Sequence, residues 1–207
     1  MNNRCGKLQL VFLGVISVIT ELYADTIDMS GQEPYERCGY CHEYDGNSRM
    51  PGFPSLAGQS EDYIHKQLQD FRSGKRKGTM QSIAEILSNK EIDIVARYFS
   101  EQQTTLPPIE DRTDMTLGKK IYFRGKQQPI VPACASCHGK QGEGMHVNPR
   151  LANQLPDYLY TQMINFKQAA RKNDSGAVMR RISSALTEQE IASLASFLAT
   201  MPIETKH

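Results

Sequence analysis

Two five-residue stretches with one pattern constrain this chain more than any other feature. They are Cys38-Gly39-Tyr40-Cys41-His42 and Cys134-Ala135-Ser136-Cys137-His138. A Cys-x-x-Cys-His segment is typical of c-type haem attachment, in which both thiols bond to the haem vinyl groups and the histidine binds the iron. We therefore predict two covalently bound haem c groups. The predicted attachment residues are Cys38, Cys41, Cys134 and Cys137, and the predicted iron ligands are His42 and His138.

Zinc or disulfides are the alternative interpretation of the four cysteines, because Cys-x-x-Cys pairs also chelate zinc. Zinc does not require a histidine directly after the second cysteine, and both copies have one. The fifth cysteine, Cys5, lies near the start of the chain, away from both motifs.

Residues 1–24 have the pattern of an export signal. Arg4 and Lys7 provide a positive start, residues 8–20 carry no charge, and Ala24 is small. Because a membrane-spanning helix needs about 20 apolar residues, we favour a cleaved signal peptide over the alternative of an uncleaved membrane anchor. Export agrees with the haem motifs, since covalent haem attachment in bacteria is completed outside the cytoplasmic membrane. We expect a periplasmic protein.

The chain contains an internal repeat. Cys38 and Cys134 are 96 residues apart, and the offset then becomes 95 and, after a four-residue insertion, 99. Matched pairs include Pro54 with Pro149, Leu56 with Leu151, Tyr63 with Tyr158, Gln67 with Gln162, Phe71 with Phe166, Arg76 with Arg171, Met80 with Met179, Leu87 with Leu186 and Ile92 with Ile191. We predict two copies of one small domain, at residues 25–108 and 109–207, joined by an extended proline-containing linker at 102–112.

Each copy has the periodicity of helices. Apolar and aromatic residues recur at helical spacing from Tyr63 to Phe71 and from Tyr158 to Phe166. The last helix of each copy begins with a capping box, Ser88-x-x-Glu91 or Thr187-x-x-Glu190, and should end near Phe99 or Ser100 and near Thr200. No segment alternates long enough to indicate a strand. We predict an all-α protein in which haem supplies much of the core of each small domain.

A low-spin electron-transfer iron also needs a sixth ligand, and methionine is the ligand that raises the potential. Only Met80 and Met179 fall at matching positions, 38 and 41 residues after the respective histidines. We predict that they are the axial ligands. The other candidates are less suitable, because Met163 matches a leucine, Met50 and Met145 follow the histidines too closely, His65 and His146 have no counterparts, and His207 is terminal.

Two further pairs of residues recur around each motif. The carbonyl groups of Pro54 and Pro149 are placed to accept the proton on the second ring nitrogen of the ligand histidines. Arg76 and Arg171 precede the methionines, where we expect them to bind haem propionates. Solvated helix ends are the alternative for these arginines.

The combined motifs resemble the dihaem class I cytochromes c of the cytochrome c4 type. The resemblance rests on the tandem Cys-x-x-Cys-His segments, Phe53-Pro54-x-Leu56-Ala57-Gly58-Gln59, the Tyr63–Arg76 pattern and the later methionines, and it covers nearly all of residues 33–202. It implies two cytochrome c domains around a pseudo-twofold axis, with haems close to their interface and histidine–methionine ligation.

Three features depart from that family pattern. Glu43 stands where glycine is common after the histidine, and Asn153 stands where the first copy has Gly58. Residues 117–122 resemble the family's N-terminal helix, whereas the first copy offers only a short lead at 30–37 that contains Pro34.

Charge is distributed unequally along the chain. Residues 25–110 contain 9 basic and 14 acidic residues, net −5, whereas residues 111–207 contain 13 basic and 8 acidic residues, net +5. Such a dipole can steer charged partners in a salt-dependent way, with Lys167, Arg171 and Lys172 as candidates, or simply keep each surface soluble.

These features favour an electron shuttle over an enzyme. The expected partners are redox proteins, for example a membrane quinol-oxidising complex and a terminal oxidase or reductase, with membrane association as an option and no nucleic acid. A haem subunit of a dehydrogenase or oxidase complex is the alternative. A dihaem peroxidase or thiosulfate-oxidising cytochrome is disfavoured, because both copies offer a methionine at the same place and, after the predicted signal, no cysteine is left over from the two motifs.

Overall fold

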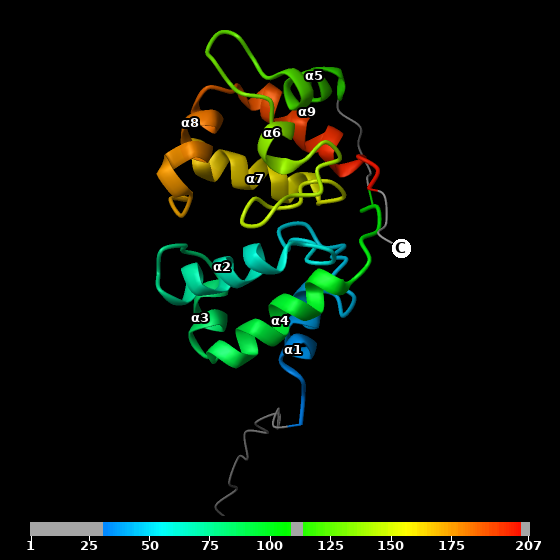
Figure 1. The fold of residues 1–207 in the computed structure, drawn as a ribbon, viewed down its shortest axis with the longest axis vertical. Coiled ribbons are helices and arrows are strands. Elements are labelled where there is room, and N and C mark those ends of the chain that lie inside the picture. The colour runs from blue at the N-terminus through cyan, green and yellow to red at the C-terminus, as the bar shows by residue number, and fades with distance from the viewer. Residues whose placement is uncertain (1–30, 109–113, 204–207) are drawn as a thin grey trace, which may run out of the picture. The chain divides into compact units, whose positions relative to one another are not determined.

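The helices of this protein follow the repeat: in the described residues, the four helices of the first copy have counterparts in the same order in the second copy, which also contains two further helices (Figure 1). The computed structural model describes residues 31–108 and 114–203; the predicted signal segment, part of the linker and His207 lie outside this range. From Gln32 onward the described residues form a single unit. The helices are α1 (Pro34–His42), α2 (Glu61–Arg72), α3 (Met80–Glu85), α4 (Asn89–Glu101), α5 (Thr116–Arg124), α6 (Ala135–His138), α7 (Pro156–Lys167), the 3-10 helix η1 (Ser175–Ala177), α8 (Val178–Ser184) and α9 (Glu188–Ala199).

The predicted all-α class is confirmed. Apart from two isolated bridges, Lys126 with Val131 and Met145 with Asn148, the described residues contain no β-structure. No helix in residues 31–108 or 114–203 combines the length and the apolar composition that a membrane span needs.

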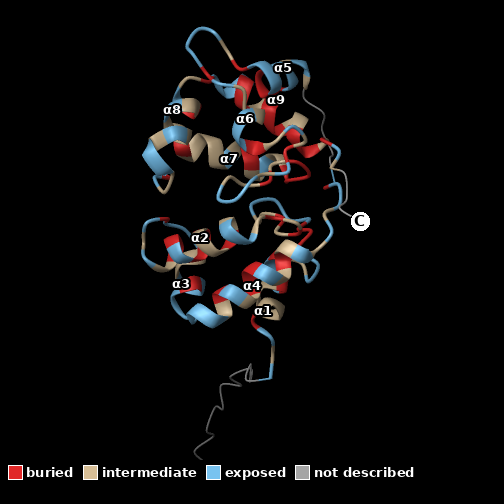
Figure 2. Cartoon of the chain, viewed as in Figure 1, coloured by how far each residue is buried: buried red, intermediate tan, exposed pale blue. Residues whose placement is uncertain are grey.

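Each copy has its own apolar core. In the first, α2 packs against α3 and α4, and the buried side chains include Leu68, Phe71, Ile92 and Phe99. In the second, α7 packs against α8 and α9 around a matching cluster. Buried residues line the inward faces of α4 and α9 (Figure 2).

Both predicted capping boxes are present. The Ser88 hydroxyl accepts a hydrogen bond from the Glu91 amide, and the Glu91 carboxylate accepts one from the Ser88 amide. Thr187 and Glu190 make the same reciprocal pair at the start of α9. These bonds satisfy amides that a helix N-terminus otherwise leaves unpaired. The helices end within two residues of the predicted positions.

The copies differ where the sequence departs from the family pattern. In the second copy α5 crosses α9 so closely that a Cβ on Gly118 would collide with the Ser193 carbonyl, and the Gly118 amide donates to the Ser193 hydroxyl at 2.7 Å. In the first copy α1 begins at Pro34, includes the whole cysteine motif and itself packs against α4. Proline is well suited to the first turn of a helix, so the short lead still supplies a helix for α4.

Candidate haem sites

Each ligand-candidate histidine is fixed by the proline carbonyl that the sequence predicted. His42 Nδ1 lies 2.8 Å from the Pro54 oxygen, and His138 Nδ1 lies 2.9 Å from the Pro149 oxygen. Because a carbonyl can only accept, Nδ1 must carry the proton, which leaves Nε2 with the lone pair that a metal needs. Both rings are buried, and burial lowers the pKa of both histidines, so they are neutral at physiological pH.

The cysteines of each motif lie in two different environments. Cys38 and Cys134 pack against the apolar clusters, and burial raises the pKa of each thiol to about 11. Cys41 and Cys137 are exposed. Two cysteine thiols and one buried imidazole in each motif suit covalent attachment of haem through two thioethers and one nitrogen ligand, so the residues fit the group that the motif implies.

The alternative of zinc or disulfides finds no support in residues 31–108 and 114–203. All four motif cysteines are free thiols, and no group of three or more histidine, cysteine or acidic side chains is close enough to hold a metal ion.

The candidate methionines begin equivalent short helices. Met80 is the first residue of α3 and packs against the first core, and Met179 is the second residue of α8. Both are partly buried. Met163 packs against the core of the second copy, as expected for a structural residue, whereas Met50 and Met145 are exposed. The histidines without counterparts pair with carboxylates, His65 with Asp93 and His146 with Asp62.

Arg76 and Arg171 are not solvated helix ends; that alternative was wrong. Each is only 8% exposed, and each guanidinium lies over a phenylalanine of its own copy, with its carbon 4.5 Å from the ring centre of Phe71 or Phe166. The sequence could not reveal their burial, because the residues that cover them come from the other copy.

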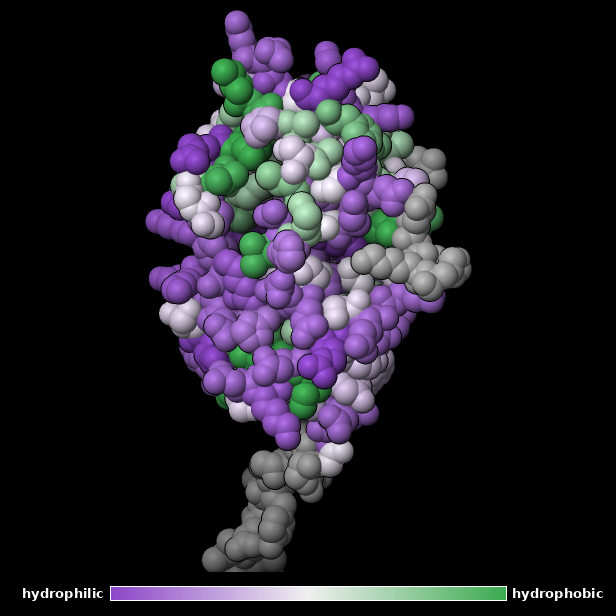
Figure 3. All heavy atoms as spheres, viewed as in Figure 1, coloured by the Kyte–Doolittle hydropathy of each residue, from purple (hydrophilic) through white to green (hydrophobic). Residues whose placement is uncertain are grey.

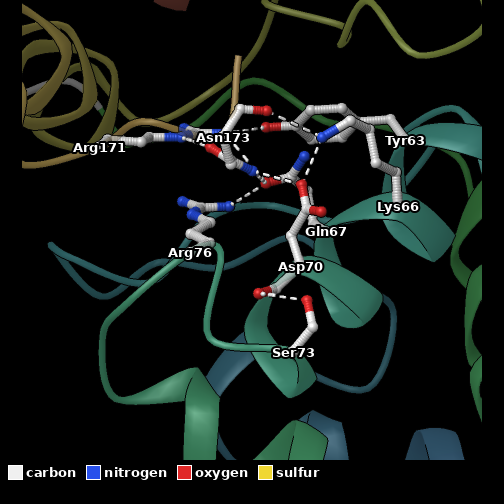
Figure 4. A network of polar contacts seen from close by, with 8 residues as sticks. All are labelled: Tyr63, Lys66, Gln67, Asp70, Ser73, Arg76, Arg171 and Asn173. Carbon is white, nitrogen blue, oxygen red and sulfur yellow. Dashed lines mark hydrogen bonds and ion pairs between the residues drawn. The ribbon is translucent and has the colours of Figure 1, made fainter. Parts of the chain in front are cut away.

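The two guanidinium groups join the copies through a nearly symmetric network, of which Figure 4 draws the contacts to Tyr63 and Gln67 of the first copy. Arg76 donates to Gln67 of its own copy at 2.7 Å. Across the interface, it donates to Tyr158 at 3.0 Å and to Gln162 at 2.9 Å. Arg171 donates to Gln162 and, across the interface, to Tyr63 and Gln67, at 2.9, 3.0 and 3.0 Å. Burial by itself would raise the pKa of Tyr63, but the two nearby cations, Arg171 and Arg76, hold this pKa below its ordinary value.

Only one side of this network carries a carboxylate. The Asn173 side chain donates to Gln67 and to Asp70, at 2.9 and 2.8 Å, and Lys66 pairs with Asp70 and donates to the Asn173 carbonyl. Asn173 belongs to the stretch between Arg171 and Met179, which is four residues longer than its counterpart. The insertion therefore supplies a contact that the repeat alone would not predict.

A second set of contacts between the copies was missed in the sequence. The Gln154 amide accepts from the Ser55 nitrogen at 2.8 Å and donates to the Ser55 carbonyl at 2.9 Å. In the matching place, the Gln59 amide accepts from the Arg150 nitrogen at 2.7 Å and donates to the Arg150 carbonyl at 3.1 Å. The signal was available, because Gln59 and Gln154 recur at the same offset as Pro54 and Pro149.

Two successive sets of short helices, each with a buried Cys-x-x-Cys-His imidazole oriented by a proline carbonyl, define the class of tandem class I cytochromes c. Comparisons with known proteins narrow that class. Residues 115–202 match the cytochrome c family model.

Full-length relatives then identify the family. Cytochrome c4 of Azotobacter vinelandii is 34% identical, over 82% of this chain and 86% of the relative. The thiosulfate dehydrogenase electron acceptor of Stutzerimonas stutzeri is 33% identical over 91% of this chain and 93% of its own length. The crystal structure of reduced recombinant cytochrome c4 from Pseudomonas stutzeri is similar with a TM-score of 0.76 and 32% identity, covering 82% of this chain and 97% of that one. The chain belongs to the cytochrome c4 family, whose members have two tandem cytochrome c domains and carry electrons on covalently bound haem c.

Proposed function

We propose that this protein is a periplasmic dihaem electron carrier, with one haem c in each copy of the repeat. Cys38, Cys41 and His42 would hold the first, with Met80 as the second axial ligand. Cys134, Cys137, His138 and Met179 would hold the second. When bound, each iron supplies the redox chemistry by taking up and releasing one electron.

One observation carries this proposal. Both buried imidazoles bond to a proline carbonyl at nearly the same distance, 2.8 and 2.9 Å, so both copies fix the same tautomer with Nε2 as the metal-binding atom. A copy that had lost its iron site would be under no requirement to keep this arrangement.

We propose the boundary between the two domains near residue 108.

The chain's own residues also fix how electrons would enter and leave. Cys41 and Cys137 are exposed, so the thioethers that they would form would lie near the surface and each haem would come within reach of a partner. Arg76 and Arg171 remain our candidates for propionate contact, because both cations are buried and neither forms an ion pair with a carboxylate of the described residues. The partners would be redox proteins, such as a quinol-oxidising membrane complex and a terminal oxidase or reductase.

A narrower function is favoured by one comparison. The relative that is matched over 91% of this chain is named as the electron acceptor of thiosulfate dehydrogenase. We include a sulfur-compound dehydrogenase among the candidate donors, either as a free partner or as a subunit of one complex.

Single methionine variants test the iron ligation. We expect the mature wild type to carry two haems per chain by mass spectrometry and to show the weak sulfur-to-iron band in its oxidised spectrum. Met80→Ala and Met179→Ala should each reduce that band by about half, because each removes one of two thioether ligands. Met163→Leu is the matched control and should leave the band unchanged.

The contrary result is equally clear. Rapid carbon monoxide binding to the reduced wild type would show an open iron and would favour an enzyme over a carrier. A chain with one haem would contradict the dihaem proposal.

A further inference from the structure

Arg150 is a fixed positive charge buried between the two loops whose proline carbonyls bond to His42 and His138. Its side chain is 2% exposed, and it directly follows Pro149, whose carbonyl accepts from His138. One guanidinium nitrogen donates across the interface to the Ser55 carbonyl at 3.1 Å, and Ser55 follows Pro54, whose carbonyl accepts from His42. The main chain of Arg150 therefore adjoins one of the carbonyls that orient the predicted iron ligands, and its guanidinium bonds to the residue that follows the other.

The side chain of Arg150 breaks an otherwise symmetric arrangement. The side-chain amides of Gln59 and Gln154 each make two hydrogen bonds to the main chain of one residue in the other copy, the residue that follows the proline. That residue is Ser55 in the first copy and Arg150 in the second. These hydrogen bonds join each loop to the other copy without a charged side chain. They do not by themselves account for an arginine at this position.

The charge of Arg150 has no anionic partner among the described residues. Its guanidinium donates only to the carbonyl groups of Ala152 and Ser55, its Nε has no hydrogen-bond partner in the described part of the chain, and none of the ion pairs there includes it. Arg76, by contrast, contacts tyrosine and glutamine side chains and is influenced by Asp70. Burial lowers the pKa of Arg150 to about 10, which still leaves it protonated at neutral pH.

A buried cation without a carboxylate partner among the described residues is costly to fold and acts over a longer range than a solvated one. Oxidation of a haem iron adds one positive charge, which such a cation disfavours. We infer that Arg150 is a positioning residue that raises the reduction potential of both haems, by placing one shared positive charge between the two loops whose proline carbonyls orient the predicted iron ligands. This inference rests on the proposed dihaem function.

The test is a redox titration of the holoprotein. Arg150→Gln keeps side-chain N–H donors and removes the charge, and Arg150→Met removes both. We expect both midpoint potentials to fall in each variant, by on the order of tenfold in the reduction equilibrium, or about 59 mV for one electron. Arg150→Lys, titrated at pH 6, keeps the charge and should retain both potentials. Arg97→Gln removes an exposed charge from α4 and should change neither.

The outcomes separate this inference from the proposed function. Haem content and the sulfur-to-iron band are recorded first in every variant, and their absence in the wild type would refute the dihaem proposal itself. With both intact, unchanged potentials in Arg150→Gln and Arg150→Met would overturn the role of Arg150, and so would a fall confined to one haem. A purely structural role would lower the unfolding temperature while leaving the potentials unchanged. If Arg150→Gln does not fold, Arg150→Met decides, because an apolar replacement of a buried unpaired charge is often tolerated.

Discussion

Glu43 adopts a backbone conformation that is almost reserved for glycine. Directly after α1 it has φ 62° and ψ 152°, and its counterpart after α6, Gly139, has φ 85° and ψ 160°. A side chain in this region costs roughly 1–3 kcal/mol. The departure at position 43 is therefore a strained site next to His42, the predicted ligand of the first iron. Asn153 is a milder case. Its φ is 56°, close to the 62° of its counterpart Gly58, and asparagine tolerates a positive φ.

We predict that Glu43→Gly stabilises the protein. Relief of backbone strain should exceed the roughly 0.4–1 kcal/mol that glycine adds to the entropy of the unfolded chain, for a net gain of about 1 kcal/mol in unfolding free energy. Thermal unfolding of the holoprotein measures it. Glu43→Ala removes the same carboxylate but keeps the Cβ, so a similar gain in that variant would show that charge, not strain, is responsible.

Among the helices, α4 shows most clearly how local chemistry sets an element boundary. Its first turn is closed by the Ser88–Glu91 capping box, and the Glu91 carboxylate also pairs with Arg37 of α1 at 2.5 Å. The Ser88 amide and hydroxyl, followed by Arg37, hold the pKa of Glu91 below its ordinary value. One side chain thus begins a helix and attaches a second helix to it.

We predict that Glu91→Gln lowers the unfolding free energy by about 0.5–1 kcal/mol at pH 7, because glutamine keeps part of the cap but not the charge. Because the folded-state pKa lies below the ordinary value of 4.5, the wild-type advantage is present above that pH and disappears as the pH falls through the folded-state pKa. Chemical unfolding at a series of pH values measures the difference.

Glu101→Gln, at the exposed end of the same helix, is the control and should change stability little at any of these pH values. A difference between Glu91→Gln and the wild type that stayed constant down to pH 2 would contradict the role of the ionised carboxylate.

At the scale of the whole molecule, the charge difference between the copies has to be tested with residues other than Lys167 and Arg171, which the sequence suggested. Arg171 is buried in the network between the copies, and Lys167 donates to the Ser184 and Leu186 carbonyls. Neutralising them would perturb the structure as well as the charge. On the face shown in Figure 3, hydrophilic side chains cover most of the first copy, whereas apolar ones are more frequent over the second. Exposed basic residues of the second copy include Lys119, Lys120 and Lys140.

We predict that changing Lys119, Lys120 and Lys140 together to glutamate slows oxidation by an anionic reagent such as ferricyanide, by about tenfold at low salt, with a weaker effect at high salt. Stopped-flow kinetics measure the rate. A cationic oxidant should show the opposite change. Reversal of Lys75, Lys77 and Lys90 in the first copy is the matched control; equal slowing there would mean that net charge acts without regard to which copy carries it.

The sequence by itself determined the features whose causes are local. The attachment chemistry needs five consecutive residues, the capping boxes need four, and the helices follow from periodic apolar positions. The histidine–proline bonds were also predictable, because they join residues only 12 and 11 positions apart within each repeat. The axial role of Met80 and Met179 and the domain boundaries stay predictions.

Only the tertiary structure decided what the arginines and glutamines do. Arg171 donates a hydrogen bond to Tyr63, which is 108 positions away in the sequence, and Gln59 donates one to the Arg150 carbonyl, which is 91 positions away. No local pattern encodes such contacts, because they depend on how one copy is placed against the other. A polar side chain looks solvated in the sequence until another part of the chain covers it, and burial against the first copy is what gives Arg150 the role that we propose for it at both predicted haem sites.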